Sequence, residues 1–207
     1  MIKDIFLPEK IGSKRIYAQR FLGFSIVDKT VTCAVVYAKR KKTIVEKLIK
    51  KEIEQGPEQN YNERAAQAIK KILSQIEKYD QINIAAPASL VVFKELETPF
   101  KDPDKIRMIL DYEIESMLPF PIEEAITDFI ITKQRKNENS SQILVAAIRK
   151  NDLQRILDIY TAAQIEPNNI TIDLFSIYNL YQQIHFVCEG IHSMASTDYN
   201  IHLQHEI

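Results

Sequence analysis

The chain has few of the residues that phosphate-binding loops, disulfides and metal sites require. Its 207 residues contain four glycines, two cysteines and no tryptophan. No two glycines lie close enough together to form the phosphate-binding loop of a P-loop or dinucleotide-binding protein. The cysteines, Cys33 and Cys188, are far apart in the sequence and lack metal-ligand spacing. This spacing favours a reducing cytoplasm and two buried thiols over a secreted, disulfide-bonded scaffold.

The chain also has no large excess of positive or negative charge, and it has no long hydrophobic run. Lysine and arginine number 27 against 28 acidic residues, so no overall field would draw the protein onto nucleic acid or an anionic membrane. The basic run from Lys39 to Lys42 predicts a solvated hairpin turn, with a contact to phosphates or acidic headgroups as the alternative. No segment reaches the roughly 18 apolar residues that cross a bilayer, and the charged N-terminus is not a signal peptide. We therefore expect a cytoplasmic protein that reaches a membrane only through a partner.

A recognisable catalytic constellation is missing as well. No serine lies in a Gly-x-Ser-x-Gly elbow, and Ser89, Ser116 and Ser176 have no histidine nearby in the sequence. His202 and His205 have the spacing of half a metal site, but further ligands on a firm scaffold would be needed, so a solvated polar tail is the preferred interpretation. Glu113 and Glu115 would lie about 200° apart on a helix and cannot form an acid pair. These absences predict a protein that is not an enzyme and that binds no metal.

The most completely specified segment runs from residue 101 to 129, KDPDKIRMILDYEIESMLPFPIEEAITDF. Asp102 is a suitable N-cap for a helix, Pro103 suits its first turn, and Pro119 ends it. One apolar stripe recurs at helical spacing and predicts a face that packs on a partner layer. Its members are Ile106, Ile109, Leu110, Ile114, Met117 and Leu118. Because the segment is well specified but poor in nucleophiles and bases, it indicates assembly rather than catalysis.

Extended and helical patterns alternate along the chain, which predicts an α/β fold. The expected strands are 21–27, 31–37, 43–53, 82–86, 90–96, 127–133 and 142–148, and the expected helices are 62–78, 102–118, one that begins at Asn151 or Asp152, and one that begins near Leu174.

This order predicts four parts. A lead-in occupies residues 1–19, and a first unit combines 20–97 with 166–185. A compact α/β unit over 98–165 is inserted into that first unit. The pattern fades over 186–207, where we expect a weakly structured tail.

Four segments occur in an order that resembles a known family. They are FLGFSIVDKTVTCAVV, APASLVVFKELETPF, the helix that ends in MLPFPIEEAITDF, and QILVAAIRKNDLQRILDIYTAAQIEPNNITIDLFSIYNL. Their succession is similar to that of the type IV pilus assembly protein PilM and of its relative, the cytoplasmic part of GspL in type II secretion. The resemblance implies an actin-like, ribonuclease H-like fold related to FtsA, with a subdomain 1A that carries an inserted α/β subdomain 1C. The second actin-like half would be largely absent from this chain.

An actin-like fold implies a phosphate loop between the first two strands, here at Ser25, Val27, Asp28, Lys29 and Thr30. Where relatives carry a pattern like G-I-D-I-G-S-S-S-V-K, this chain has GFSIVDKTVT. Ser25 replaces the acid that would organise magnesium, and Val27 replaces the glycine that lets backbone N–H groups approach phosphate. We therefore expect no ATP or magnesium cofactor. An actin-like ATPase or kinase-type nucleotide-binding protein is the alternative.

The resemblance implies a non-enzymatic adaptor in the inner-membrane assembly platform of a type IV pilus or a type II secretion system. Such an adaptor would lie at the inner face of the inner membrane. It would bind a short N-terminal peptide of a PilN-like single-pass membrane protein, with an assembly ATPase and other platform components as further partners. By position, Phe100, Leu118 and Phe120 are candidate peptide contacts, and each is equally consistent with a core residue. A truncated fragment without independent activity is the third interpretation.

Overall fold

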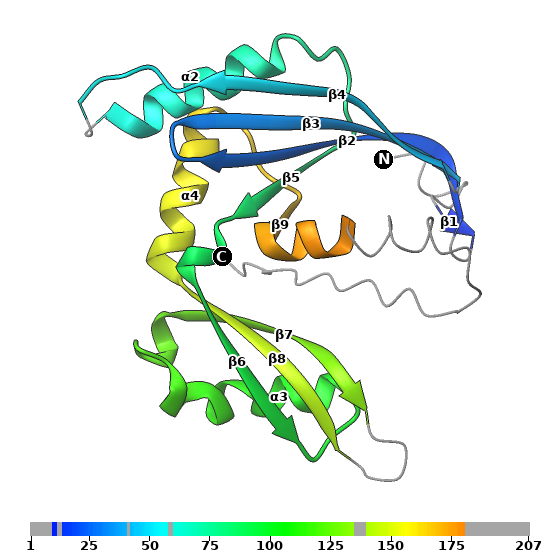
Figure 1. Cartoon of the computed structure of the whole chain (residues 1–207), viewed down its shortest axis with the longest axis vertical. Helices are drawn as coiled ribbons and strands as arrows, with labels where there is room; N and C mark the ends of the chain where they lie inside the picture. The colour runs from blue at the N-terminus through cyan, green and yellow to red at the C-terminus, as the bar shows by residue number, and fades with distance from the viewer. Residues whose placement is uncertain (1–9, 12–13, 41, 58–59, 135–139, 181–207) are drawn as a thin grey trace. The chain divides into compact units, whose positions relative to one another are not determined.

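The computed structural model describes residues 10–11, 14–40, 42–57, 60–134 and 140–180 (Figure 1). These residues divide between two compact units. The first unit runs to Ala85 and includes Asp158–Asn168, and the second combines Ala86–Leu157 with the residues from Asn169 onward. The weakly structured tail predicted for 186–207 and most of the predicted lead-in lie outside the described residues.

The first sheet contains the strands expected at 21–27, 31–37 and 43–53, joined as an antiparallel meander. Its strands are β1 (Lys10–Ile11), β2 (Lys14–Val27), β3 (Thr30–Arg40), β4 (Lys42–Glu52), β5 (Gln81–Ala86) and β9 (Asn169–Ile172). They hydrogen-bond in the order β4-β3-β2-β5-β9, with β1 paired to β2. Strands β2, β3 and β4 are antiparallel neighbours, whereas β5 runs parallel to β2. The first sheet is therefore mixed, with a three-stranded antiparallel part and a parallel strand beside it.

One face of this sheet carries the core of the first unit. Leu22 and Phe24 on β2 are buried, as is Cys33, which pairs with Phe24 across the β2–β3 ladder. Helix α2 (Tyr61–Leu73) buries an Ala- and Ile-rich stripe. Tyr160, near the end of α4 (Lys150–Ala162), packs edge to face on Phe24 with ring centroids 6.3 Å apart. Aromatic pairs favour this geometry, so the core has a defined packing arrangement.

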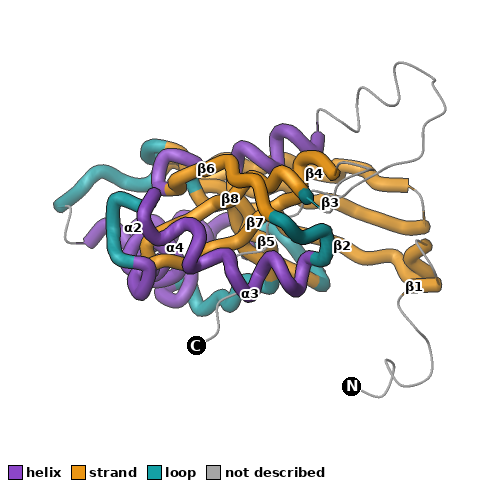
Figure 2. Tube along the Cα trace, turned by 90° about the horizontal axis from the view of Figure 1, so that it is seen from below, coloured by secondary structure: helices purple, strands orange, loops and turns teal. Residues whose placement is uncertain are grey.

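The second unit is a three-stranded antiparallel sheet with a helix along one face. The strands β6 (Val91–Thr98), β7 (Ala125–Gln134) and β8 (Ser141–Arg149) lie in the order β6-β8-β7. Figure 2 shows α3 (Pro103–Ile114) lying along them. The helix begins as predicted, because Asp102 Oδ1 accepts a hydrogen bond from the Asp104 backbone N–H at 3.0 Å. Short 3-10 turns at Ala88–Leu90, Glu115–Met117 and Ile122–Glu124 complete the unit.

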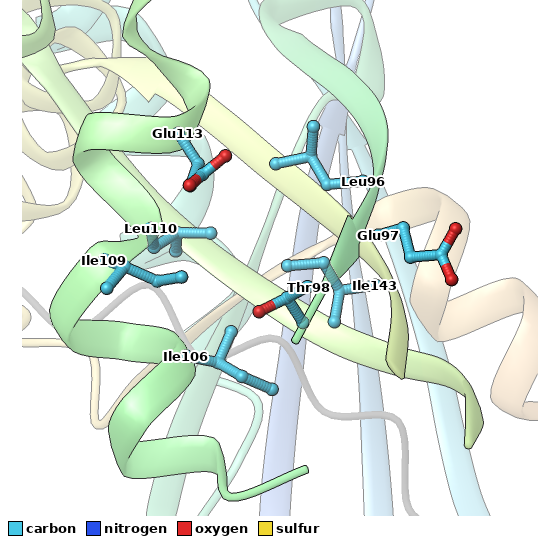
Figure 3. A pocket seen from close by; sticks show the side chains of 8 residues that line it. All are labelled: Leu96, Glu97, Thr98, Ile106, Ile109, Leu110, Glu113 and Ile143. Carbon is cyan, nitrogen blue, oxygen red and sulfur yellow. The ribbon is translucent and has the colours of Figure 1, made fainter. Parts of the chain in front are cut away.

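The apolar stripe of α3 forms the core of the second unit. Ile106, Leu110 and Ile114 are at most 2% exposed and belong to a cluster with side chains of β7 and β8. Figure 3 shows two of them, with Ile109, facing Leu96 and Ile143 on the sheet. Met117 differs from the prediction, since it is 43% exposed. The regular helix ends at Ile114 and tightens into a 3-10 turn, which changes the direction of the following side chains.

The second unit begins earlier than the sequence indicated. The sequence pattern places the strand at 90–96 in the first unit and the start of the inserted unit at residue 98. In the structure β6 pairs with β8 along its whole length, from Val91↔Ile148 to Thr98↔Ser141, so it belongs to the second unit. Because the paired residues are 43 to 57 positions apart in the chain, no local pattern could reveal the pairing.

Within the described part of the chain, no helix has both the length and the apolar character needed to cross a membrane.

Candidate functional site

The face of the β6-β8-β7 sheet opposite α3 carries a row of apolar side chains. Successive residues of a strand point to opposite faces, so Ile143 and Val145 pack under α3 while Leu144 lies on the other face. Leu144 pairs with Ile130 on β7, and Phe93 on β6 pairs with Ala146, the next residue of β8 on that face. The helix α3 therefore leaves an apolar sheet surface uncovered.

A short helical segment over residues 173–180 forms the second wall of this site. Its start is anchored to the 3-10 turn before β6, because Asp173 Oδ1 accepts a hydrogen bond from the Ala88 backbone N–H at 2.9 Å. The same oxygen accepts one from the Leu174 N–H at 2.6 Å. Phe175 is 6% exposed and packs on Phe93, with ring centroids 5.8 Å apart and ring planes at 63°. The segment is thus held by a polar and an aromatic contact.

The sheet and the helical segment form the walls of an open groove of about 590 Å³. The lining residues come from all three strands and from the helical segment, and all except one threonine are apolar or aromatic. They are Phe93, Ile130, Thr132, Leu144, Leu174, Phe175 and Tyr178. Leu174 is 52% exposed and Tyr178 is 43% exposed, so apolar surface at the groove faces solvent. A hollow of this size and lining suits the apolar side chains of a ligand, and the lining residues include no carboxylate, imidazole or thiol.

The three predicted partner contacts lie elsewhere in the second unit. Phe100, Leu118 and Phe120 are partly buried and pack against the core cluster beneath α3, on the other side of the sheet from Leu144. The guanidinium of Arg149 lies over the Phe120 ring, 4.8 Å from its centroid. The structure therefore gives all three a core position, and a role for them in partner binding stays a prediction.

The five predicted phosphate-loop residues come together in one hairpin turn. Ser25 and Val27 are at the end of β2, Thr30 begins β3, and Asp28 and Lys29 form the two-residue turn between them. Asp28 has a φ of 53°, a left-handed conformation that asparagine, aspartate and glycine adopt most readily. The carbonyl oxygen of Lys29 accepts a hydrogen bond from the Ile53 N–H at 2.7 Å, which ties the turn to the end of β4.

Cys33 is fully buried in the first sheet, as predicted. Burial raises the pKa of its thiol to about 12, because the surroundings disfavour the charged thiolate. The residue therefore behaves as a small hydrophobic side chain. Cys188, His202 and His205 lie outside the described residues.

Comparison with known proteins identifies relatives of this fold. A chain of the PilM–PilN type IV pilus biogenesis complex matches with a TM-score of 0.67 and 20% identity, over 79% of this chain and 50% of that chain. The cytoplasmic domain of EpsL, an inner membrane component of the type II secretion system of Vibrio cholerae, matches with a TM-score of 0.52 and 15% identity, over 75% of this chain and 58% of that chain. No curated protein matched the sequence.

These matches confirm the predicted fold class, an actin-like first half with an inserted α/β subdomain. The chain spans about half the length of the PilM–PilN complex chain that it matches. The family model of the type IV pilus assembly protein PilM matches residues 23–190, which include the whole second sheet and the first sheet except β1 and the first part of β2. This chain therefore belongs to the type IV pilus assembly protein PilM family.

Proposed function

We propose that this chain is a non-enzymatic adaptor of the inner-membrane assembly platform of a type IV pilus or type II secretion system. Its partner is a PilN-like single-pass membrane protein, whose N-terminal segment occupies the groove between the β6-β8-β7 sheet and the 173–180 helical segment. The observation that carries the proposal is this apolar groove of about 590 Å³ on the sheet face opposite α3. Family membership and the solved PilM–PilN complex support the choice of partner.

The groove suits an extended peptide because its apolar surface is continuous across strands. Ile130, Leu144 and Phe93 lie on three neighbouring strands, and Leu174 faces them from the helical segment. Each leucine-sized side chain that a partner buries here contributes about 1.5–3 kcal/mol. Micromolar binding corresponds to about 8 kcal/mol, and ordering the peptide adds a cost, so at least three to five anchored side chains are required.

We propose further that the adaptor works without ATP or magnesium and reaches the membrane only through its partner. Ser25 lacks the carboxylate that would organise magnesium, and Val27 occupies the position where a glycine would let phosphate approach the backbone. The groove lies on a different sheet from this hairpin turn, so peptide binding does not depend on it.

The test is a titration of the whole chain with a fluorescent peptide that contains the N-terminal residues of a PilN protein, followed by anisotropy. We expect saturable binding. The variant Leu174→Asp should weaken it at least about tenfold, because a carboxylate replaces an apolar wall of the groove. Leu174 is 52% exposed, so the substitution leaves the core of the unit intact.

The matched control is Met108→Asp, which introduces the same carboxylate at a side chain that is 85% exposed on α3. Helix α3 covers the opposite face of the sheet, so this variant should bind the peptide as the parent chain does. Absence of saturable binding, or equal loss of affinity in both variants, would refute the proposed site.

A further inference from the structure

We infer that the segment bound in the groove carries a basic residue, and that Glu95 pairs with it. In the sequence of the bound segment, the basic residue is two positions away from the apolar residue that contacts Leu144 of this chain. This inference rests on the proposed function and adds the charge that selects the partner segment.

The position of Glu95 follows from the strand register. Glu95 on β6 lies directly opposite Leu144 on β8, and Leu144 lies opposite Ile130 on β7. The three side chains therefore form one row across the sheet face that carries the groove, with neighbouring Cβ atoms about 5 Å apart. Two members of this row line the groove, and the third is an exposed carboxylate at its β6 end.

The groove continues past this row into a second hollow with an acidic wall. That hollow has a volume of about 240 Å³ and is lined by Glu95, Glu97 and Gln142 among others, and it shares Thr132 with the apolar groove. Thr132 is the extra residue of a β-bulge between Ile131 and Lys133, and its hydroxyl donates a hydrogen bond to the Gln142 carbonyl at 3.1 Å. A ligand that fills the apolar groove can therefore reach into the second hollow, where it meets acidic side chains.

The charges on this face differ between its two edges. Glu95 and Glu97 lie on β6, at one edge of the sheet, and Lys133 lies on β7, at the other edge. In the strand register, Gln142 of β8 lies between Glu97 and Lys133. Among the described residues, no basic side chain forms an ion pair with Glu95. A cationic side chain of the ligand is therefore attracted to the β6 edge and repelled from the β7 edge.

The spacing follows from the geometry of an extended peptide. Side chains that point to the same side of a strand are two residues apart, or about 6.6–6.8 Å. An apolar side chain over Leu144 thus places the next side chain on that side close to the Glu95 carboxylate, within reach of a lysine or arginine stem. A glutamate or aspartate at that position of the peptide would be repelled.

The test compares two synthetic peptides that contain the N-terminal residues of a PilN protein, the natural one and one with each basic residue replaced by glutamine. Both are titrated against the parent chain, Glu95→Gln and Lys133→Gln. Because exposed ion pairs are weak, Glu95→Gln should lower affinity for the natural peptide about 2- to 5-fold. The glutamine peptide should bind the parent chain and Glu95→Gln equally, and Lys133→Gln should not weaken either peptide.

Failure of this inference is distinct from failure of the proposed function. If both peptides bind the parent chain equally and Glu95→Gln changes neither affinity, the groove binds its partner without Glu95 and the inference is overturned. If neither peptide binds any of the chains, the proposed function is overturned and the inference with it. Glu95 is exposed, so its replacement leaves the core of the unit unchanged, which circular dichroism checks.

Discussion

Replacing Thr98 with valine is expected to stabilise the second unit. Thr98 ends β6 and is 4% exposed, and its hydroxyl has no hydrogen-bond partner among the described residues. Its partner in the ladder, Ser141, is 1% exposed and its hydroxyl is likewise unpaired within the described part of the chain. Figure 3 shows the Thr98 hydroxyl directed from β6 toward α3, into an apolar layer. Each hydroxyl was therefore removed from water without a replacement hydrogen bond.

The magnitude follows from that desolvation. A buried hydroxyl without a partner costs about 1–3 kcal/mol. Valine has almost the same shape as threonine and suits a strand, so Thr98→Val removes the penalty without opening a cavity. We expect the free energy of unfolding of the second unit to rise by about 1–2 kcal/mol.

Urea denaturation followed by far-ultraviolet circular dichroism measures this change, since the chain has no tryptophan to report by fluorescence. The matched control is Thr132→Val in the same sheet. Thr132 is exposed and donates a hydrogen bond at 3.1 Å, so this variant should be unchanged or slightly less stable.

A loss of about 1 kcal/mol or more in Thr98→Val would refute the reasoning. It would mean that the hydroxyl donates a hydrogen bond in solution. A pocket of about 10 Å³, the size of about one water molecule, adjoins Thr98 and is bordered by Glu97, Glu113 and the apolar stripe of α3. A water bound there would be the partner.

Three further predictions concern the core, the buried thiol and the hairpin turn. Ile114→Ala should lower the free energy of unfolding by about 2–5 kcal/mol in urea denaturation, because Ile114 is fully buried, whereas Met108→Ala on the exposed face of α3 should change it by less than about 0.5 kcal/mol. In a Cys188→Ser background, Cys33 should not react with Ellman's reagent at pH 8 until the chain is unfolded, since a pKa of about 12 leaves about one thiol in 10,000 as thiolate; rapid reaction in the native state would contradict this. Magnesium and ATP should not raise the thermal stability of the chain, whereas a ligand at 100 times its dissociation constant would stabilise it by about 2.7 kcal/mol.

Local signals in the sequence predicted the elements of this fold well. Asp102 and Pro103 define the start of α3, and the apolar stripe from Ile106 to Ile114 identifies its buried face. The strands expected at 21–27, 31–37 and 43–53 correspond to the three long antiparallel strands of the first sheet. These features depend on residues within one or two turns of each other, which is why the amino-acid order reveals them.

The groove could not be predicted in the same way. Its walls come from β6, β7, β8 and residues 173–180, and their contacts depend on the register of one sheet. The run that contains Phe93 follows the first unit in the sequence, but its partner strand lies far along the chain in the second unit. The bulge at Thr132, a residue that lines both hollows, leaves no pattern in the sequence. The apolar residues near Phe120 were more conspicuous, but they pack in the core.

Methyl-resolved NMR of the whole chain, titrated with the peptide that contains the N-terminal residues of a PilN protein, tests the central claim most directly. If the groove is the partner site, the methyl signals of Ile130, Leu144 and Leu174 shift in a saturable way, while those of Ile106 and Ile114 beneath α3 do not. Saturable binding of the peptide without any shift in the methyl signals of the three groove residues would contradict the account.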